Sequence, residues 1–458
     1  MRKTRILATL GPATESRESL LALREAGVNL FRINASHISP REIREIMERV
    51  RDDCPDMPTL LDLAGPKIRL GSVSMERDLV VGRRFRWEPS EGDTDDETIR
   101  FGPPSLAESL KDGGVVGVVD GRTTFRLHCK EDIYLVAERV AAPLRKGAGI
   151  SLPEGALGEG SLLSQADKRA LAVGISENVT VVAASYVRGP KDVLEVRDAM
   201  GKGSKTLLMS KIERPEVLPV LDETLALSDL VMVARGDLGA SVGLEEVPRL
   251  QKRIVKLARE RVVGVAVATE MLESMVHSPV PTRAEAMDID GAVEQGADIL
   301  TLSAETAMGD NPVQAVKWMA RIIESSEAER GFDPVRSGTG TAERIGVAAV
   351  DLAAAAGAKA FVVLTRSGFS ARNLARHRPS IPILAVVTDE MAAKRASFLR
   401  GVFPVVSTVK GVEARFLWGV RTLLARGWVA SGEKVVGALA LPHEDPGGTS
   451  GLFLLRAP

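Results

Sequence analysis

A lysine and a glutamate stand two residues apart at the end of the apolar run "KTLLMSKIE", residues 205–213. Side chains two residues apart on a β-strand point to the same face, so Lys211 and Glu213 would present an ammonium and a carboxylate side by side. Such a pair can be a solvated ion pair on a loop, or it can face a reacting group that carries charge. The choice depends on where this strand ends in the fold.

A second charged group follows another apolar run, in "LVMVARGDLG", residues 230–239. Glycine lets backbone N–H groups approach a ligand closely, and the start of a helix favours an anion. Asp237 can therefore cap the helix, or it can join Glu213 in binding a divalent cation. Mg²⁺ prefers oxygen ligands and usually takes one or two carboxylates, with water and substrate phosphate completing its shell. With Lys211 and Arg32 nearby, the second interpretation predicts a site for a phosphorylated substrate.

Eight short apolar runs recur along the chain, separated by amphipathic segments of helix length. They span residues 4–10, 28–34, 59–63, 179–187, 205–213, 230–237, 263–270 and 297–305. Strands that alternate with helices indicate a parallel sheet, and eight such units predict a closed (β/α)8 TIM barrel of the α/β class. Almost every run turns polar at its C-terminal end, where barrels of this kind carry their active sites. This position favours the functional interpretation of Lys211 and Glu213.

Two segments do not fit the repeat. Residues 72–153 contain short alternating runs separated by glycine and acidic turns, which predicts a small β-barrel domain inserted after the third strand as a lid. After a Gly/Thr/Ser linker, two or three further β/α units predict a separate C-terminal α/β domain over residues 344–458. The catalytic barrel would then comprise residues 1–71 and 154–335.

Composition narrows the partners. The chain has 458 residues, 60 Lys+Arg against 61 Asp+Glu and a net charge of -1, which argues against nucleic acid or an anionic membrane as the main partner. The only two cysteines, Cys54 and Cys129, lack metal-ligand spacing and fit a reducing cytoplasm. The apolar stretch 345–364 is interrupted by Asp351, Gly357 and Lys359, so it predicts an Ala-rich helix that leads into a strand and not a membrane span.

Several motifs, in one order along the chain, closely resemble the pyruvate kinase family. They are "ATLGPAT", "FRINASH", "SKIERPE", "VMVARGDLG", "TEMLESMVHSPVPTRAEA" and "LSAETAMGDNPVQAV". The resemblance covers all three regions and is strongest in the barrel. It implies a cytoplasmic glycolytic enzyme that converts phosphoenolpyruvate and ADP to pyruvate and ATP, with Mg²⁺ or Mn²⁺ as cofactor and a homotetrameric assembly.

The resemblance also implies roles for individual residues. Lys211 would neutralise charge on the phosphoryl group in flight and on the enolate, and Arg32 would contact the phosphoryl group. The implied catalytic residues are Lys211, Arg32, Thr269, Ser303 and Glu305, and the implied substrate contacts are Arg32, Lys211, Gly236, Asp237 and Thr269. The metal ligands would be Glu213 and Asp237, and the nucleotide contacts Arg32, Asn34, His37, Arg69 and Lys146. The group that protonates the enolate stays open.

The segment "LLDLAGPKIRL", residues 60–70, departs from the potassium-dependent members of that family. Those members carry glutamate at the position of Lys67, lysine at that of Ala64 and threonine at that of Leu63. They hold K⁺ among residues that match Asn34, Ser36, Asp62 and the carbonyl of residue 63. Potassium-independent relatives carry lysine at position 67. We therefore predict activity without K⁺, the alternative being a surface lysine that happens to fall here.

Other departures concern the lid and the C-terminal domain. Val119 stands beside Asp120 where relatives usually have a second aspartate. Ala148 occupies the position of an expected lysine, and Lys146, two residues earlier, would contact the phosphates in its place. Glu270 replaces a usual glutamine. The loop and helix in "VLTRSGFSARNLARHRP", residues 363–379, suit a phosphate, and relatives often bind a phosphorylated effector there. The candidate effector residues are Thr365, Arg366, Ser367, Gly368 and Ser370, with Phe369 at a position that is often polar.

Two alternatives stay open. A barrel lyase or aldolase acting on pyruvate enolate would also use Glu213, Asp237 and Arg32, but it would need neither a lid nor the motif "RINASH". A catalytically degraded relative that only binds metabolites is suggested by the departures, including Ala64, and is opposed by retention of Lys211 and both acids.

Overall fold

The structure is a computed structural model of the whole chain. It describes residues 1–75, 77–90, 92–119, 121–129, 133–153, 155, 160–328, 331–332, 334–337, 340–439, 449 and 451–458, and of His37 the backbone alone. Asp120, which the sequence analysis singled out, lies outside the described residues.

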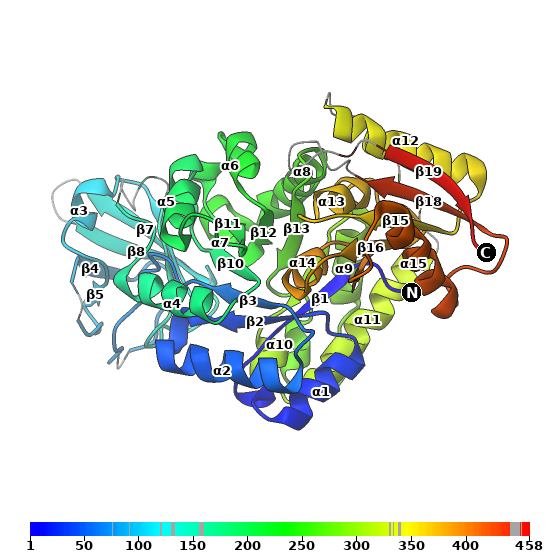
Figure 1. Cartoon of the computed structure of the whole chain (residues 1–458). Coiled ribbons are helices and arrows are strands. Elements are labelled where there is room, and N and C mark those ends of the chain that lie inside the picture. The colour runs from blue at the N-terminus through cyan, green and yellow to red at the C-terminus, as the bar shows by residue number, and fades with distance from the viewer. Residues whose placement is uncertain are drawn as a thin grey trace.

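Eight parallel strands close into a barrel at the centre of the molecule, as the sequence predicts (Figure 1). The strands are β1 (Arg5–Thr9), β2 (Leu30–Asn34), β3 (Thr59–Asp62), β10 (Val181–Ala184), β11 (Leu207–Ile212), β12 (Leu230–Ala234), β13 (Gly264–Ala268) and β14 (Ile299–Leu302). Their order around the barrel is β1-β14-β13-β12-β11-β10-β3-β2. Each expected apolar run contains one of them, so the predicted fold class is confirmed.

Helices alternate with these strands. They are α1 (Arg17–Ala26), α2 (Pro40–Asp53), α4 (Gln165–Ser176), α5 (Pro190–Met200), α6 (Leu221–Leu227), α7 (Arg235–Val242), α8 (Val247–Glu260), α9 (Arg283–Gln295), α10 (Ala304–Ala307) and α11 (Pro312–Ala328). The start of α2 shows the local chemistry: Ser39 caps the helix, Pro40 occupies its first turn, and the Glu42 carboxylate accepts a hydrogen bond from the Ser39 N–H. In α8 the buried Leu250, Ile254 and Ala258 recur every four residues and form the face that packs on the barrel.

A six-stranded sheet, in the order β5-β4-β8-β7-β6-β9, lies between β3 and α4 in sequence and at one end of the barrel in space (Figure 1). Its elements are β4 (Arg84–Glu88), β5 (Thr98–Arg100), α3 (Leu106–Ser109), β6 (Val115–Val118), β7 (Thr123–Cys129), β8 (Ile133–Val140) and β9 (Ile150–Ser151). The alternating apolar residues of these strands form their own core, which contains Phe85, Trp87 and Phe125. We call this domain the lid. The sequence pattern does not indicate β5 or β9, which are only 3 and 2 residues long.

The C-terminal domain lies at the opposite end of the barrel (Figure 1). Its elements are α12 (Thr341–Ala356), β15 (Ala360–Leu364), α13 (Phe369–Ala375), β16 (Ile383–Val387), α14 (Glu390–Ala396), β17 (Val402–Val406), α15 (Val412–Ala425), β18 (Lys434–Leu439) and β19 (Gly451–Arg456). The sheet order is β17-β16-β15-β18-β19, with β19 antiparallel to β18. The α/β character is as predicted. The numerical domain boundaries given above stay a prediction.

The interior of the barrel is closed by a side chain from the C-terminal domain. Alternate strand residues such as Leu7, Met209 and Met232 fill the interior, while their neighbours face the helices. Phe398, between α14 and β17, is fully buried in the same interior cluster. Two buried ion pairs hold this junction: Arg378 lies 2.8 Å from Asp298, which precedes β14, and Arg400 lies 3.0 Å from Glu327 of α11.

We expect Phe398→Ala to lower the free energy of unfolding by about 3–5 kcal/mol, because it leaves a cavity at the base of the barrel. Phe369→Ala, which shortens a half-buried phenylalanine of the same domain, is the matched control and should cost much less. Urea unfolding followed by circular dichroism measures both. Equal losses of stability for the two variants would contradict the role of Phe398 in closing the barrel interior.

Candidate active site

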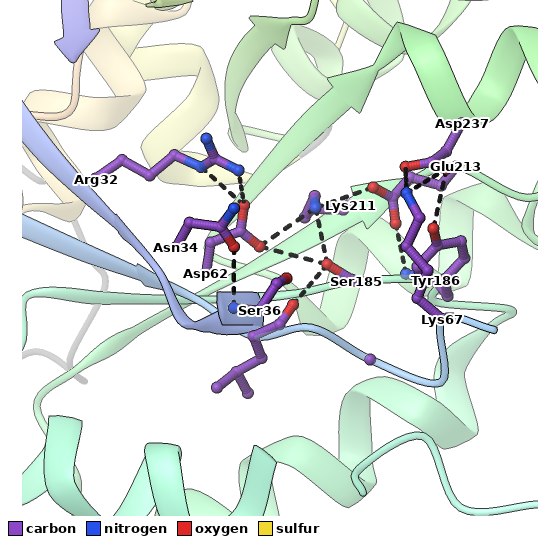
Figure 2. Close-up of polar contacts among 12 residues, drawn as sticks. Arg32, Asn34, Ser36, Asp62, Lys67, Ser185, Tyr186, Lys211, Glu213 and Asp237 are labelled. Carbon is purple, nitrogen blue, oxygen red and sulfur yellow. Dashed lines mark hydrogen bonds and ion pairs between the residues drawn. The ribbon is translucent and has the colours of Figure 1, made fainter. Parts of the chain in front are cut away.

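The predicted pair at the end of β11 lies inside the barrel mouth. Lys211 Nζ is 2.9 Å from Glu213 Oε1, 3.2 Å from Asp62 Oδ1 of β3, and 2.7 Å from the Ser185 hydroxyl that follows β10 (Figure 2). The Lys211 side chain is 11% exposed, and those of the two acids at most 2%. This is therefore not a solvated loop pair. The ends of three neighbouring strands contribute four polar groups to a single buried cluster.

The charges in this cluster support one another. Burial acts to lower the pKa of Lys211, but the carboxylates of Asp62 and Glu213 override it, so the pKa is raised and the ammonium stays charged. Burial acts to raise the pKa of Asp62, and here Lys211 and Arg32 prevail and lower it. Asp62 thus remains a carboxylate in a buried site.

Arg32, at the end of β2, completes the cluster on one side. Its Nε lies 2.8 Å and its Nη2 2.7 Å from Asp62 Oδ2, while Nη1 donates to the Thr9 hydroxyl at 2.8 Å. The fork of the guanidinium is therefore fixed by two strands, β1 and β3. An arginine held in this way presents a fixed positive charge at the mouth, as an anionic substrate requires.

Glu213 has fewer polar contacts than Asp62 among the described residues. Its Oε2 accepts a hydrogen bond from the Tyr186 N–H at 2.6 Å. Apart from the ion pair with Lys211, its Oε1 is buried without a hydrogen-bond partner. Burial, with the nearby charge of Asp237, raises the pKa of Glu213 in spite of Lys211. A carboxylate that is buried, close to a second carboxylate and short of partners is well suited to a cation.

Asp237 stands in the first turn of α7, and no helix-capping hydrogen bond is formed at that terminus. Its Oδ1 instead accepts from the Tyr186 hydroxyl at 2.9 Å and from Lys67 Nζ at 3.1 Å, and Lys67 Nζ lies 5.8 Å from the centre of the Tyr186 ring. Burial, together with Asp237 and Glu213, raises the pKa of Tyr186, so the phenol keeps its proton to donate. The capping interpretation of Asp237 is therefore wrong for this structure.

Gly236 and Thr269 lie against each other across the ends of β12 and β13. A Cβ atom added to Gly236 would lie 2.9 Å from Thr269 Cγ2, so only glycine fits. Thr269 itself has a φ of 79°, which is unusual for a β-branched residue. Arg235 fixes this conformation, because its Nε donates to the Thr269 carbonyl at 3.1 Å while its Nη1 lies 2.6 Å from Asp288 Oδ2 of α9.

Ser303 and Glu305 follow β14, and the Glu305 carboxylate contacts backbone groups. Glu305 accepts hydrogen bonds from the Ser303 N–H at 2.6 Å and from the Leu272 N–H at 3.0 Å, and it is buried. Burial outweighs these bonds and raises the pKa of Glu305. The geometry makes Glu305 a positioning residue for the loop that carries Thr269.

The oxygens present fit a divalent cation. Glu213 offers its buried Oε1, which pairs with the Lys211 ammonium and accepts no further hydrogen bond from the described residues, and Figure 2 shows Asp237 beside it. Within the described residues no group of three or more His, Cys, Asp or Glu forms a complete metal cage. An ion held here would take its remaining ligands from water and substrate, which is how Mg²⁺ is commonly bound.

Known proteins resemble this chain along almost its whole length. The family model described as "Pyruvate kinase, barrel domain" matches residues 1–316, and the one described as "Pyruvate kinase, alpha/beta domain" matches residues 343–453. A curated pyruvate kinase of Agrobacterium vitis is 35% identical over 99% of this chain and 97% of its own. The chain belongs to the pyruvate kinase family. Further curated relatives are a pyruvate kinase of Thermotoga maritima, 33% identical over 96% of this chain and 97% of its own, and pyruvate kinase 2 of Saccharomyces cerevisiae, 35% identical over 95% and 92%.

The nucleotide residues expected from the pyruvate kinase resemblance are only partly brought together. Asn34 and Arg32 share the end of β2, and Arg69 Nη1 donates to the Gly147 carbonyl at 2.9 Å, which ties the segment after β3 to the loop before β9. Lys146 is exposed on that same loop. The side chain of His37 lies outside the described part of the chain. These nucleotide contacts stay a prediction.

The residues expected from the resemblance to surround a monovalent cation lie at the strand ends of the barrel mouth, and this role stays a prediction. Asn34 Oδ1 accepts from the Ser36 N–H at 3.2 Å, and the Ser185 hydroxyl joins the Leu63 carbonyl, at 2.7 Å, to Asp62 Oδ1, at 3.3 Å. Lys67 does not join them, because its ammonium pairs with Asp237. The lysine thus adds its charge on the Asp237 side of the cluster.

In the C-terminal domain the candidate effector loop supplies many of its own hydrogen bonds. Thr365 Oγ1 accepts from the Gly368 N–H at 3.0 Å, Ser367 Oγ from the Phe369 N–H at 3.3 Å, and Ser370 Oγ from the Thr449 hydroxyl at 2.9 Å. Arg366 is exposed. Residues 440–448 and 450 lie outside the described residues, so the effector site stays a prediction.

Sequence reasoning missed Ser185 and Tyr186. Both stand at the polar end of the run 179–187, so the rule that identified Lys211 applies to them as well. Tyr186 has a φ of 61°, which no sequence pattern indicates.

Among the described residues, no helix has the length and apolar character to cross a membrane.

Asp62→Asn is expected to lower the free energy of unfolding at pH 7 by about 3–5 kcal/mol, because it removes one partner of buried charges. Because the folded-state pKa of Asp62 is lowered, its contribution is present above the ordinary Asp pKa of about 3.9 and is lost as pH falls through the lower folded value. The gap to the unsubstituted protein should therefore narrow below about pH 4.

Thermal unfolding between pH 7 and pH 3 measures this gap. Asp56→Asn, which changes an exposed ion pair with Arg24, is the control and should stay within about 0.5 kcal/mol of the unsubstituted protein at pH 7. A gap for Asp62→Asn that is independent of pH would show that its carboxylate is not the group responsible.

Proposed function

We propose that the protein transfers the phosphoryl group of phosphoenolpyruvate to ADP, giving pyruvate and ATP in glycolysis. The observation that carries this proposal is the buried cluster of Lys211, Asp62, Glu213 and Arg32 at the barrel mouth, in which fixed positive and negative groups lie side by side. Phosphoryl transfer depends on positioning and on electrostatic stabilisation of developing negative charge, which fixed cations in a buried site supply. Membership of the pyruvate kinase family supports the same reaction.

Lys211 and Arg32 would stabilise the phosphoryl group in flight, and Lys211 also the enolate that is left. A unit charge about 4 Å from developing negative charge contributes about 4 kcal/mol at an effective dielectric near 20. This corresponds to about a thousandfold in rate. The Gly236 and Asp237 amides at the start of α7 would hold the substrate carboxylate, and Thr269 would face the enolate, positioned by Ser303 and Glu305.

Glu213 and Asp237 would hold Mg²⁺ or Mn²⁺, which would supply positive charge to the phosphoryl oxygens. The pKa of Glu213 is raised, so its carboxylate binds a cation less well as pH falls. Arg32, Asn34, His37, Arg69 and Lys146 would face ADP.

We further propose that the reaction needs no added K⁺. The support is Lys67, whose ammonium stands at the barrel mouth 3.1 Å from Asp237, together with the apolar Leu63 in place of a hydroxyl residue. A resident ammonium would make a separate monovalent cation unnecessary. The protein is proposed to act in the cytoplasm.

The alternatives have less support. A lyase or aldolase would not use the lid, whose loop before β9 is tied to Arg69. A degraded relative that only binds metabolites would not be expected to keep a buried lysine with two acids, because such charges are costly to bury and are retained at functional sites. Calorimetric binding of phosphoenolpyruvate and ADP without turnover would favour the degraded relative.

We also propose a homotetramer, in which β19 contributes to contacts between chains. In the described part of the sheet β19 is an edge strand, and its Phe453 and Leu454 are 45% and 46% exposed. Exposed apolar edge strands favour pairing with another chain. Light scattering after size exclusion should give the mass of four chains, and Leu454→Lys should reduce it, since lysine on an edge strand opposes pairing. A monomeric mass for the unsubstituted protein would contradict the proposal.

The main test is the initial rate of pyruvate formation from phosphoenolpyruvate, ADP and Mg²⁺. It is measured with K⁺ and with a tetraalkylammonium salt at equal ionic strength, and equal rates are expected. Lys211→Met is the control and should be about a thousandfold slower in both salts. A large rise with K⁺ would contradict the role of Lys67 while leaving the reaction in place, and absence of turnover in both salts would overturn the proposed reaction.

A further inference from the structure

The lid and the barrel mouth carry opposite charges that face each other. Arg122 Nη2, in the turn between β6 and β7, lies 3.8 Å from Oε1 of Glu270, which follows β13. We propose that this pair is a latch that holds the lid over the site and positions the neighbouring Thr269. Arg122 and Glu270 are thus positioning residues for the reaction, and the kinetic part of this inference rests on the proposed function.

On the barrel side, Glu270 is joined to a rigid piece of backbone. Thr269 and Glu270 have φ values of 79° and 55°, a conformation that side chains with a Cβ rarely adopt. Arg235 fixes it through hydrogen bonds to the Ala268 and Thr269 carbonyls, and Asp288 holds Arg235. Because this backbone has little freedom, a contact that fixes the Glu270 side chain also restricts the position of Thr269.

On the lid side, Arg122 belongs to a turn that rests on the barrel. The Arg122 N–H donates to the Val119 carbonyl at 3.0 Å, and Arg139 donates to the Gly121 carbonyl. Gly121 has a φ of 74°, and a Cβ added there would lie 2.9 Å from the Cβ of Ala240 in α7. The turn therefore meets the helix whose first residues form the proposed carboxylate site.

The lid is also anchored at a second place, on the side of the metal ligands. Arg214, next to Glu213, donates to the Leu152 carbonyl at 2.7 Å and to the Pro153 carbonyl at 3.1 Å, where the chain leaves the lid. Arg214 is 2% exposed, so this anchor is buried. The Arg122–Glu270 pair is different, because both side chains are more than half exposed, at 54% and 58%.

An exposed pair at this distance is weak and is screened by salt, which suits a contact that must open at every turnover. It borders a cavity of about 460 Å³ between the lid and the barrel, which is lined also by Arg139, Arg235 and Asp288. Arg235 pairs with Asp288 and Arg139 with the lid backbone. Glu270 is therefore the acid that faces the lid turn, and it occupies the position where relatives usually have glutamine.

The test uses the full chain with Arg122→Glu, Glu270→Arg and the double charge swap. Hydrogen exchange in the free enzyme is followed in peptides that cover residues 121–129 and 264–272. Each single reversal should raise exchange in both peptides about fivefold and lower kcat/KM for phosphoenolpyruvate about fivefold, and the double swap should restore both to within about twofold. Arg122→Lys should keep kcat/KM near the unsubstituted value, and added salt should relieve part of the loss in the single reversals, because it screens the like charges that they create.

The control is Arg126→Glu, which breaks a pair with Glu138 that lies wholly within the lid sheet. It should leave exchange in residues 264–272 unchanged. The latch is overturned if the single reversals leave exchange in residues 264–272 unchanged, or if the double swap is as impaired as the singles. If the unsubstituted protein shows no turnover, the proposed function fails, and hydrogen exchange still decides on the latch.

Discussion

A buried ammonium between two buried carboxylates organises this molecule. Removing any one of Lys211, Asp62 and Glu213 from water is costly, and only the close approach of the others offsets the cost. This arrangement requires β3 and β11 to end at the same level with β10 between them. The Ser185 hydroxyl, which follows β10, hydrogen-bonds both Lys211 and Asp62. A closed barrel meets this requirement because its register is fixed by pairing on both edges of every strand.

The rigidity of the barrel also sustains strained backbone at its mouth. Tyr186, Thr269 and Glu270 all have positive φ values, and all three follow barrel strands. Two of them are held by groups from neighbouring elements: Tyr186 by Glu213 and Asp237, and Thr269 by Arg235. Such conformations persist only where the surroundings over-determine them, and they concentrate at functional sites. The site is therefore preorganised by hydrogen bonds to backbone as much as by the charged side chains themselves.

The sequence predicts the architecture well, because period-two and helix-length patterns report directly on burial. It also predicts that Lys211, Glu213, Asp237 and Arg32 share one end of the barrel, since the strand ends of a parallel barrel coincide. It does not predict partners. Lys67 pairs with Asp237 and not with Asn34, Ser36 and Asp62, because the direction of a long side chain depends on tertiary contacts. Nor does any local pattern show that Asp62 binds both Lys211 and Arg32, or that the short β5 and β9 complete the lid sheet.

The seating of Phe398 in the floor of the barrel has a consequence for how the chain is made. Synthesis runs from the N-terminus, so all eight barrel strands have left the ribosome about a hundred residues before Phe398 does. Until then the interior is open at its base, and the carbonyls of Leu399 and Val402 that later receive Arg5 do not yet exist. The first strand therefore lacks part of its contacts until the C-terminal domain has been synthesised. During biosynthesis the nascent barrel exposes an apolar opening, a surface of the kind that chaperones recognise.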